Sequence, residues 1–202
     1  VSLSDGILVA NKGDLDLQQL RWMEGQGIPV VISIWEFPDR HPGIPCVAFD
    51  SRRAGEMATE HLLSLGHAKI GAIVASPAHG IHGGRYSGFL DAMKAANAGV
   101  NDRHVRFCVD SFEGGYQAAR DLLIDKPDLT ALFVSNDLPA LAVLDAAADL
   151  GIRVPEDISV VSITDIQLAG QSRPTLTTVA IPTTEMAACG IKLLLEMIEK
   201  KP

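Results

Sequence analysis

The sequence predicts an α/β protein with a doubly wound parallel sheet architecture, and three observations lead to that prediction. Eight short aliphatic runs recur along the 202 residues, and stretches with the apolar spacing of helices separate most of them. The runs are continuous and rich in Val and Ile, which is typical of parallel strands covered on both faces. Gly27, Gly66 and Gly151 each follow a helical stretch, where a glycine commonly ends a helix.

The expected elements follow one another in this order along the chain. The strands are ILVA (7–10), IPVVI (28–32), CVAF (46–49), IGAIVA (70–75), VRFCV (105–109), ALFV (131–134), ISVVSI (158–163) and LTTVAI (176–181). Four helical stretches have a clear apolar face, formed by Ala54, Met57, Ala58, Leu62 and Leu65, by Phe89, Met93 and Ala96, by Leu138, Leu141, Ala142 and Leu144, and by Met186, Gly190, Leu193, Leu194 and Met197. Residues 38–43 form the most loop-like stretch.

Composition and charge exclude several classes of protein. With 47% hydrophobic and 21% charged residues, the chain has the composition of an ordinary soluble globular protein. Its net charge of -8 makes the chain itself a poor nucleic-acid binder, because an acidic surface repels phosphates. Cys46, Cys108 and Cys189 lie far apart, which argues against a disulfide framework and a zinc site. The sequence has no secretory signal and no apolar run near the roughly 20 residues of a membrane span, so we expect a cytoplasmic protein that does not enter a membrane.

Polar side chains follow almost every predicted strand. Ligands of open parallel sheets bind outside the carboxyl ends of the strands, so these residues are candidates for one shared binding site. They are Ser33 and Trp35 after 28–32, Ser76 and then Arg85 after 70–75, Asp110 after 105–109, Ser135, Asn136 and Asp137 after 131–134, and Thr164 and Asp165 after 158–163. Together they predict a small polar ligand that is held by a ring of hydrogen-bond donors and acceptors.

Each of these residues also has a purely structural explanation. Residues 135–137 are good helix N-caps, and capping is the commoner role at a strand-to-helix turn. Asp165 could cap the next element, and Arg85 could pair with Asp91 or Glu113 on the surface. Only their convergence on one edge of a sheet favours a binding site.

No catalytic, cofactor or metal motif is visible in the sequence. A Gly-x-Ser-x-Gly elbow is absent, since the serine of residues 84–88 is one place off, and so are Gly-x-Gly-x-x-Gly and a phosphate loop. His79 and His82 have the spacing of two metal ligands, but they lie on a glycine-rich stretch without a carboxylate or cysteine nearby, so we expect a solvated loop. We therefore expect neither catalysis nor a bound cofactor or metal. An α/β enzyme that uses Asp137 or Asp165 as a base is an alternative that ligand turnover would reveal.

Longer motifs, in their order and spacing, resemble the effector-binding region of lactose/galactose-repressor (LacI/GalR) type transcription regulators. The motifs are DGILVA (5–10), GIPVV (27–31), VAFDSRRAGEMATEHLLSLGHAKI (47–70), RYSGFLDAM (85–93), GGYQAARDLL (114–123), LFVSNDLPALAVLDAAADLGIRVPEDISVV (132–161) and RPTLTTVAIPTTEMA (173–187). They cover nearly the whole chain. Each motif alone is weak, but the combination is specific.

This resemblance implies a two-lobed fold like that of type I periplasmic sugar-binding proteins. Residues 1–55 and 182–202 would form part of the N-terminal lobe, and residues 56–181 a complete C-terminal lobe. The family's helix-turn-helix headpiece, and the two βα units that precede the DGILVA motif in the family, have no counterpart in this chain. An N-terminal lobe without its first strands is expected to leave an open sheet edge.

The resemblance also implies ligand contacts by position. Arg85 matches the family's effector-contacting arginine, whose planar fork of donors suits vicinal hydroxyls or a carboxylate. Asn136 matches an asparagine whose amide can both donate to and accept from a sugar. We expect the substitution Arg85→Ala to abolish effector binding without unfolding the protein.

Three positions depart from the family's pattern. Thr164 stands where the family usually has the first aspartate of a pair, with Asp165 second, and Asp110 stands where an aromatic side chain often stacks on the ligand. The loop position after residues 28–32, often Asp-Arg in the family, reads Ile34-Trp35 here, and Trp35 could supply the missing stacking face. The pocket should therefore differ from a typical sugar pocket, and we expect an amine or cationic group of the ligand to face Asp110.

Regulation of transcription is the function that the resemblance implies. A small polar effector, a sugar or a related molecule, would shift the closure of the two lobes, and in a homodimer the lobes would set the spacing of two headpieces on operator DNA. The alternative is a periplasmic solute-binding protein of a transport system, which shares the lobes and the ligand chemistry. The motifs VPEDISVV and PTLTTV, and the missing signal, favour the regulator.

Overall fold

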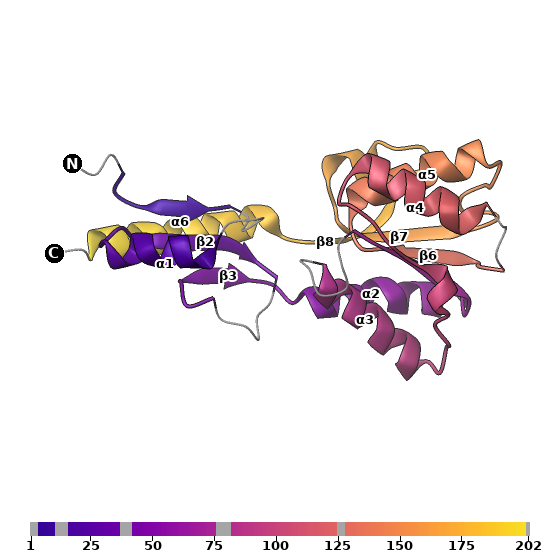
Figure 1. Ribbon diagram of the computed structural model, residues 1–202, viewed down its shortest axis with the longest axis horizontal. Coiled ribbons are helices and arrows are strands. Elements are labelled where there is room, and N and C mark those ends of the chain that lie inside the picture. The colour runs from indigo at the N-terminus through magenta and orange to yellow at the C-terminus, as the bar shows by residue number, and fades with distance from the viewer. Residues whose placement is uncertain (1–3, 11–15, 37–41, 76–81, 125–127, 201–202) are drawn as a thin grey trace. The chain divides into compact units, whose positions relative to one another are not determined.

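The computed structural model describes residues 4–10, 16–36, 42–75, 82–124 and 128–200. The chain forms two compact units, residues 1–50 with 182–202 (unit 1) and residues 51–181 (unit 2). Each unit has its own parallel sheet (Figure 1). The expected lobe boundary at residue 55 falls inside helix α2 (Ser51–Ser64), which belongs entirely to unit 2.

Unit 2 is a five-stranded parallel sheet with helices on both faces. Its strands lie in the order β5-β4-β6-β7-β8, and they are β4 (Ile70–Val74), β5 (Val105–Phe107), β6 (Ala131–Val134), β7 (Ser159–Thr164) and β8 (Thr177–Ala180). On one face α2 packs with α3 (Gly83–Ala95), and on the other α4 (Phe112–Leu123) packs with α5 (Asp137–Asp149) (Figure 1). Two short 3-10 helices, η1 (Asp102–His104) and η2 (Gln167–Gly170), precede β5 and follow β7. The predicted doubly wound α/β fold is confirmed.

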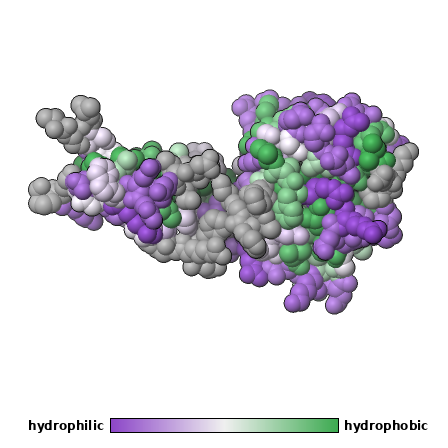
Figure 2. Space-filling model, viewed as in Figure 1, coloured by the Kyte–Doolittle hydropathy of each residue, from purple (hydrophilic) through white to green (hydrophobic). Residues whose placement is uncertain are grey.

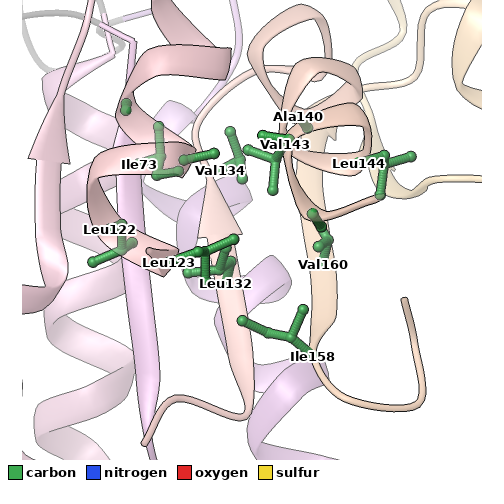
Figure 3. Packing of buried hydrophobic residues seen from close by; sticks show 14 of the residues in the cluster. Ile73, Leu122, Leu123, Leu132, Val134, Ala140, Val143, Leu144, Ile158 and Val160 are labelled. Atoms are coloured by element: carbon green, nitrogen blue, oxygen red, sulfur yellow. The ribbon is translucent and has the colours of Figure 1, made fainter. Parts of the chain in front are cut away.

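Alternate residues of the strands fill two separate cores in unit 2. Ile73, Leu132 and Val160 belong to the core under α4 and α5, part of which Figure 3 shows. The next residues along two of these strands, Val74 and Phe133, belong to the core under α2 and α3. Both faces of the sheet are therefore buried, and this is why the strands are continuous aliphatic runs in the sequence.

Helix ends follow the sequence pattern. Gly27, Gly66 and Gly151 have φ values of 78°, 89° and 70°, in the left-handed region that terminates helices. Ser111 caps α4, because its side chain accepts a hydrogen bond of 3.0 Å from the backbone N–H of Gly114. The glycines thus mark where helices end, and Ser111 marks where α4 begins.

Unit 1 is smaller. Its sheet has the order β1-β2-β3, with β1 (Ile7–Val9), β2 (Val30–Trp35) and β3 (Cys46–Ala48), and its helices are α1 (Leu17–Gly25) and α6 (Thr183–Glu199). Helix α6 lies close on the sheet, since a Cβ added at Gly190 would be 2.7 Å from Cβ of Ser33. The core of unit 1 consists of Val9, Leu20, Val30, Ile32, Trp35 and Ile44. Within the described residues β1 pairs with β2 alone, so one of its edges is open.

The surface is mixed in character. Figure 2 shows hydrophobic patches between hydrophilic residues on the visible face of unit 2. None of the helices in the described ranges combines the length and the apolar character that crossing a membrane requires.

Candidate ligand-binding site

The candidate residues of unit 2 lie at one edge of its sheet. Strands β4 to β7 run parallel, so their carboxyl ends meet at the same edge. Arg85 lies in the first turn of α3, Asp110 lies before α4, Asn136 caps α5, and Thr164 ends β7. Hydrogen bonds connect all four, although the strands they follow are widely separated in the sequence.

Arg85 is buried beneath this edge, with 4% of its surface exposed. Its Nη1 donates hydrogen bonds to the carbonyl oxygen of Ser135 at 2.7 Å and to Oγ1 of Thr164 at 3.4 Å. Asp91, a surface partner considered for Arg85, forms an ion pair with Arg52. Arg85 therefore belongs to the interior of the strand-end network and not to the charged surface.

Two glycines allow helix α3 to pack closely against α2, and this close packing positions the buried Arg85. A Cβ at Gly55 of α2 would lie 2.0 Å from the carbonyl oxygen of Arg85, and a Cβ at Gly88 of α3 would lie 2.0 Å from the carbonyl oxygen of Arg52. Real Cβ atoms do not approach backbone oxygens this closely, so only glycine fits at both positions. The backbones of α2 and α3 are therefore in direct contact, and this contact fixes the first turn of α3.

Asn136 combines the capping role and the network role. Its Oδ1 accepts hydrogen bonds of 2.9 Å from the backbone N–H of Asp137 and from Oγ1 of Thr164. Its Nδ2 donates to both carboxylate oxygens of Asp110, at 2.9 and 3.0 Å. The amide is thus oriented by its neighbours on both sides, with the oxygen toward β7 and the nitrogen toward Asp110.

Asp110 is the member of the network that faces solvent. Its side chain is 42% exposed, whereas that of His82, whose Nε2 lies 3.3 Å from the Asp110 carboxylate, is 7% exposed. Partial burial works to raise the pKa of Asp110, but the hydrogen bond and charge of His82, the amide of Asn136 and the charge of Arg85 together lower it below the ordinary value. Burial and the charge of Asp110 raise the pKa of the neighbouring Cys108 to about 11, so that thiol stays protonated.

Asp137 has a different environment from Asp110. It is fully buried, and its Oδ1 accepts from the hydroxyls of Ser162 at 2.6 Å and Thr178 at 2.7 Å. Its Oδ2 accepts from the backbone N–H of Ile166 at 2.7 Å. Three donors hold this carboxylate between α5, β7 and β8, so it has a structural role and is unsuited to act as a base on a ligand.

The turn after β7 has an unusual backbone. Thr164 has a φ of 143° and Asp165 a φ of 63°, and positive values are rare for residues with a Cβ, above all for a β-branched one. The backbone N–H of Asp165 is held by Oγ1 of Thr178 at 3.3 Å. Backbone strain of this kind concentrates at functional sites, where the surrounding structure maintains it.

His82 was placed wrongly by the sequence interpretation. It was expected on a solvated loop, yet only 5% of the residue is exposed, because it directly precedes α3 and its ring packs beside Asp110. Its position one helical turn before Arg85 was the signal that could have identified it. Within the described part of the chain, no group of three His, Cys, Asp or Glu side chains could hold a metal ion.

Three other predicted site residues are placed as follows. Asp165 is exposed at the end of the β7 turn, next to the network. Trp35 lies in the core of unit 1 with 7% of its surface exposed, and its stacking role stays a prediction. Ser76 lies outside the described residues, as does His79.

Residues 59–202 match the family described as "Periplasmic binding protein-like domain". A curated relative is the HTH-type transcriptional repressor PurR of Yersinia pestis bv. Antiqua (strain Antiqua), with 32% identity over 203 residues. This match covers 98% of the present chain but only 58% of the repressor, so the chain spans somewhat more than half the length of that relative.

Solved structures of regulators have the same fold. A LacI family transcriptional regulator from Mycobacterium smegmatis is 29% identical with a TM-score of 0.83, and the match covers 100% of this chain and 73% of that one. The transcriptional regulator CelR in complex with cellobiose is 30% identical with a TM-score of 0.82, and the match covers 99% of this chain and 61% of that one.

Proposed function

Because this chain belongs to the periplasmic binding protein-like domain family, as the effector-binding region of a LacI/GalR type transcription regulator, we propose that it binds a small polar effector at the carboxyl edge of the unit 2 sheet. One observation supports this site most strongly. Arg85, Thr164, Asn136 and Asp110 come from four separate segments and form one continuous chain of hydrogen bonds at that edge.

The effector is proposed to be a sugar or a sugar-like molecule. A related regulator, 30% identical to this chain, was solved with the disaccharide cellobiose. Hydroxyl groups both donate and accept hydrogen bonds, and the network presents to them the half-exposed carboxylate of Asp110, which the amide of Asn136 holds in place. Such polar groups at the end of a parallel sheet fix the orientation of a small ligand.

The regulatory step is proposed to act on DNA through a segment outside this chain. The net charge of -8 makes these 202 residues unsuited to bind the phosphate backbone directly. A headpiece carried by the full-length regulator would contact operator DNA, in the cytoplasm where that DNA is. The effector would favour one arrangement of the two units over another, and would thereby change operator affinity.

We also propose that the chain pairs with a second copy. A two-fold dimer is the commonest arrangement of soluble homo-oligomers, and it would present two headpieces of the full-length regulator to the two half-sites of an operator. Sedimentation velocity on the purified chain should give twice the monomer mass of 21.5 kDa.

Replacing the buried arginine tests the binding site. A thermal-shift screen of sugars, sugar acids, polyols and nucleobases should first identify a ligand that raises the melting temperature in a concentration-dependent manner. The substitution Arg85→Met keeps the apolar volume but removes the guanidinium, and titration calorimetry should then show at least about a tenfold loss of affinity.

A matched control separates this effect from a general loss of positive charge. Arg53 is exposed on α2 and pairs with Glu56 and Glu60, so Arg53→Met removes the same group without touching the network. Its affinity should equal that of the unchanged protein. Retained affinity in folded Arg85→Met would place the binding site elsewhere.

A further inference from the structure

The network at the strand ends uses its amide donor internally. Asn136 directs its Nδ2 at both oxygens of Asp110, at 2.9 and 3.0 Å, and its oxygen already accepts from Thr164 and from the N–H of Asp137. A ligand that needs an amide donor would have to displace Asp110. A ligand that brings its own donors would meet the network as it stands.

Asp110 is the acceptor that such a ligand would meet. Its side chain is 42% exposed, while the groups that orient it are behind it: His82 is 5% exposed and Arg85 4%. Each carboxylate oxygen has several lone-pair sites, and the contacts with Asn136 and His82 occupy only part of them. Its lowered pKa keeps the carboxylate ionised at neutral pH.

We propose that Asp110 is the specificity-determining residue of this site, and that it selects effectors that donate hydrogen bonds through hydroxyl or ammonium groups and rejects anionic ones. This inference rests on the function proposed above and deepens it by naming the chemical class of the effector. A hydroxyl or ammonium group opposite Asp110 gains a charge-assisted hydrogen bond, which is about twice as strong as a neutral one. A carboxylate or phosphate at the same place meets a like charge that is fixed by its neighbours.

Arg85 does not offset this bias at the surface of the site. Its positive charge is buried, and its Nη1 is directed to the carbonyl oxygen of Ser135. The exposed charge of the network is thus the negative charge of Asp110.

Three ligand panels that differ in charge test the inference. The first contains neutral sugars, polyols and nucleobases, the second amino sugars, and the third sugar acids and sugar phosphates. Thermal shift and then titration calorimetry rank the binders of the unchanged protein, of Asp110→Asn and of Asp128→Asn. Asp128 pairs with Lys69 just before β6, beyond the opposite end of the strands, so Asp128→Asn removes an equal charge away from the network.

The strongest binder of the unchanged protein should come from the neutral or amino panel. Asp110→Asn should weaken it about tenfold or more, because a charge-assisted hydrogen bond becomes a neutral one at best, while Asp128→Asn should leave its affinity unchanged. Asp110→Asn should also gain affinity for the sugar acids.

The possible failures are distinguishable. If the strongest binder is a sugar acid or phosphate, or if a bound neutral ligand is unaffected by Asp110→Asn, the inference on Asp110 is wrong while the proposed binding function stands. If no compound of the three panels binds the unchanged protein, both fail. The ranking for the unchanged protein decides the question even if Asp110→Asn does not fold.

Discussion

Two carboxylates mark two regions of the same sheet edge, and their surroundings differ sharply. The Asp137 centre consists of Asp137, the hydroxyls of Ser162 and Thr178, and the N–H of Ile166, and its carboxylate is fully buried. The Asp110 centre consists of Asp110, His82, Asn136, Thr164 and Arg85, and its carboxylate is 42% exposed. Both carboxylates accept several hydrogen bonds. The difference in exposure therefore separates a group that holds strands together from one that can meet a ligand.

The comparison also explains why the two centres are neighbours. Asn136 and Asp137 are consecutive, and the start of α5 directs the first toward Asp110 and the second toward β7 and β8. The Asp137 centre fixes the turn after β7 through Ile166, and that turn carries Thr164. The contacts of the Asp137 centre are thus needed to hold Thr164 in its position in the Asp110 centre.

The largest effect should come from breaking the Asp137 centre. Asp137→Ala leaves one buried donor, the hydroxyl of Ser162, and two half-buried donors without this acceptor, and we expect the free energy of unfolding to fall by about 2–4 kcal/mol. Urea denaturation followed by circular dichroism measures the change. Asp149→Ala is the control, since Asp149 lies at the end of the same helix, is exposed and accepts a single hydrogen bond from Tyr116. If both variants lost the same small amount, Asp137 would not have the structural role assigned to it.

A smaller effect should follow from removing one hydroxyl of the Asp110 centre. Thr164→Val keeps the β-branched shape at φ 143° but removes the group that links Arg85 to Asn136. Both partners keep another contact, on the carbonyl of Ser135 and on the N–H of Asp137, so the unfolding free energy should fall by only about 1 kcal/mol.

The same urea titration compares this variant with Thr177→Val, which removes a hydroxyl from an exposed position of β8. The control should be close to neutral. If Thr164→Val lost as much unfolding free energy as Asp137→Ala, the two centres would not differ in structural importance.

The fold could be predicted from the sequence because strands that are buried on both faces of a sheet consist almost entirely of apolar residues. The runs at 70–75, 131–134 and 158–163 are apolar except for Ser159 and Ser162, and they form the three inner strands of unit 2. The run at 105–109 was predicted two residues too long, since β5 ends at Phe107, and within the described residues this edge strand pairs with β4 alone. The apolar face of helix α4 was not identified from the sequence, although its motif GGYQAARDLL (114–123) was.

The site could be predicted only in part. Parallel strands bring their carboxyl ends together, so Arg85, Asn136 and Thr164 were expected at one edge, and the structure brings them together there. Residues 135–137 were three equivalent capping candidates, because the direction of each side chain depends on tertiary contacts that no local pattern encodes. The burial of His82 was missed for the same reason, as its ring packs beside Asp110, which is distant in the sequence.

The smallest effect should be a dependence on pH that belongs to the Asp110 centre. The pKa of Asp110 is lowered from 3.8, since His82, Asn136 and Arg85 outweigh the opposing effect of partial burial. Below the ordinary pKa the unfolded chain binds a proton that the folded chain does not, so this stabilisation is complete above about pH 5 and is lost as pH falls through the folded pKa. Because the side chain is 42% exposed, solvent screening keeps the contribution below about 1 kcal/mol. Melting temperatures of the unchanged protein and of Asp110→Asn, measured between about pH 3 and pH 7, should therefore differ most at neutral pH and converge in acid. A difference that stays constant across this range would mean that the Asp110 carboxylate contributes no charge-dependent stability, and that His82 and Asn136 do not hold it as described.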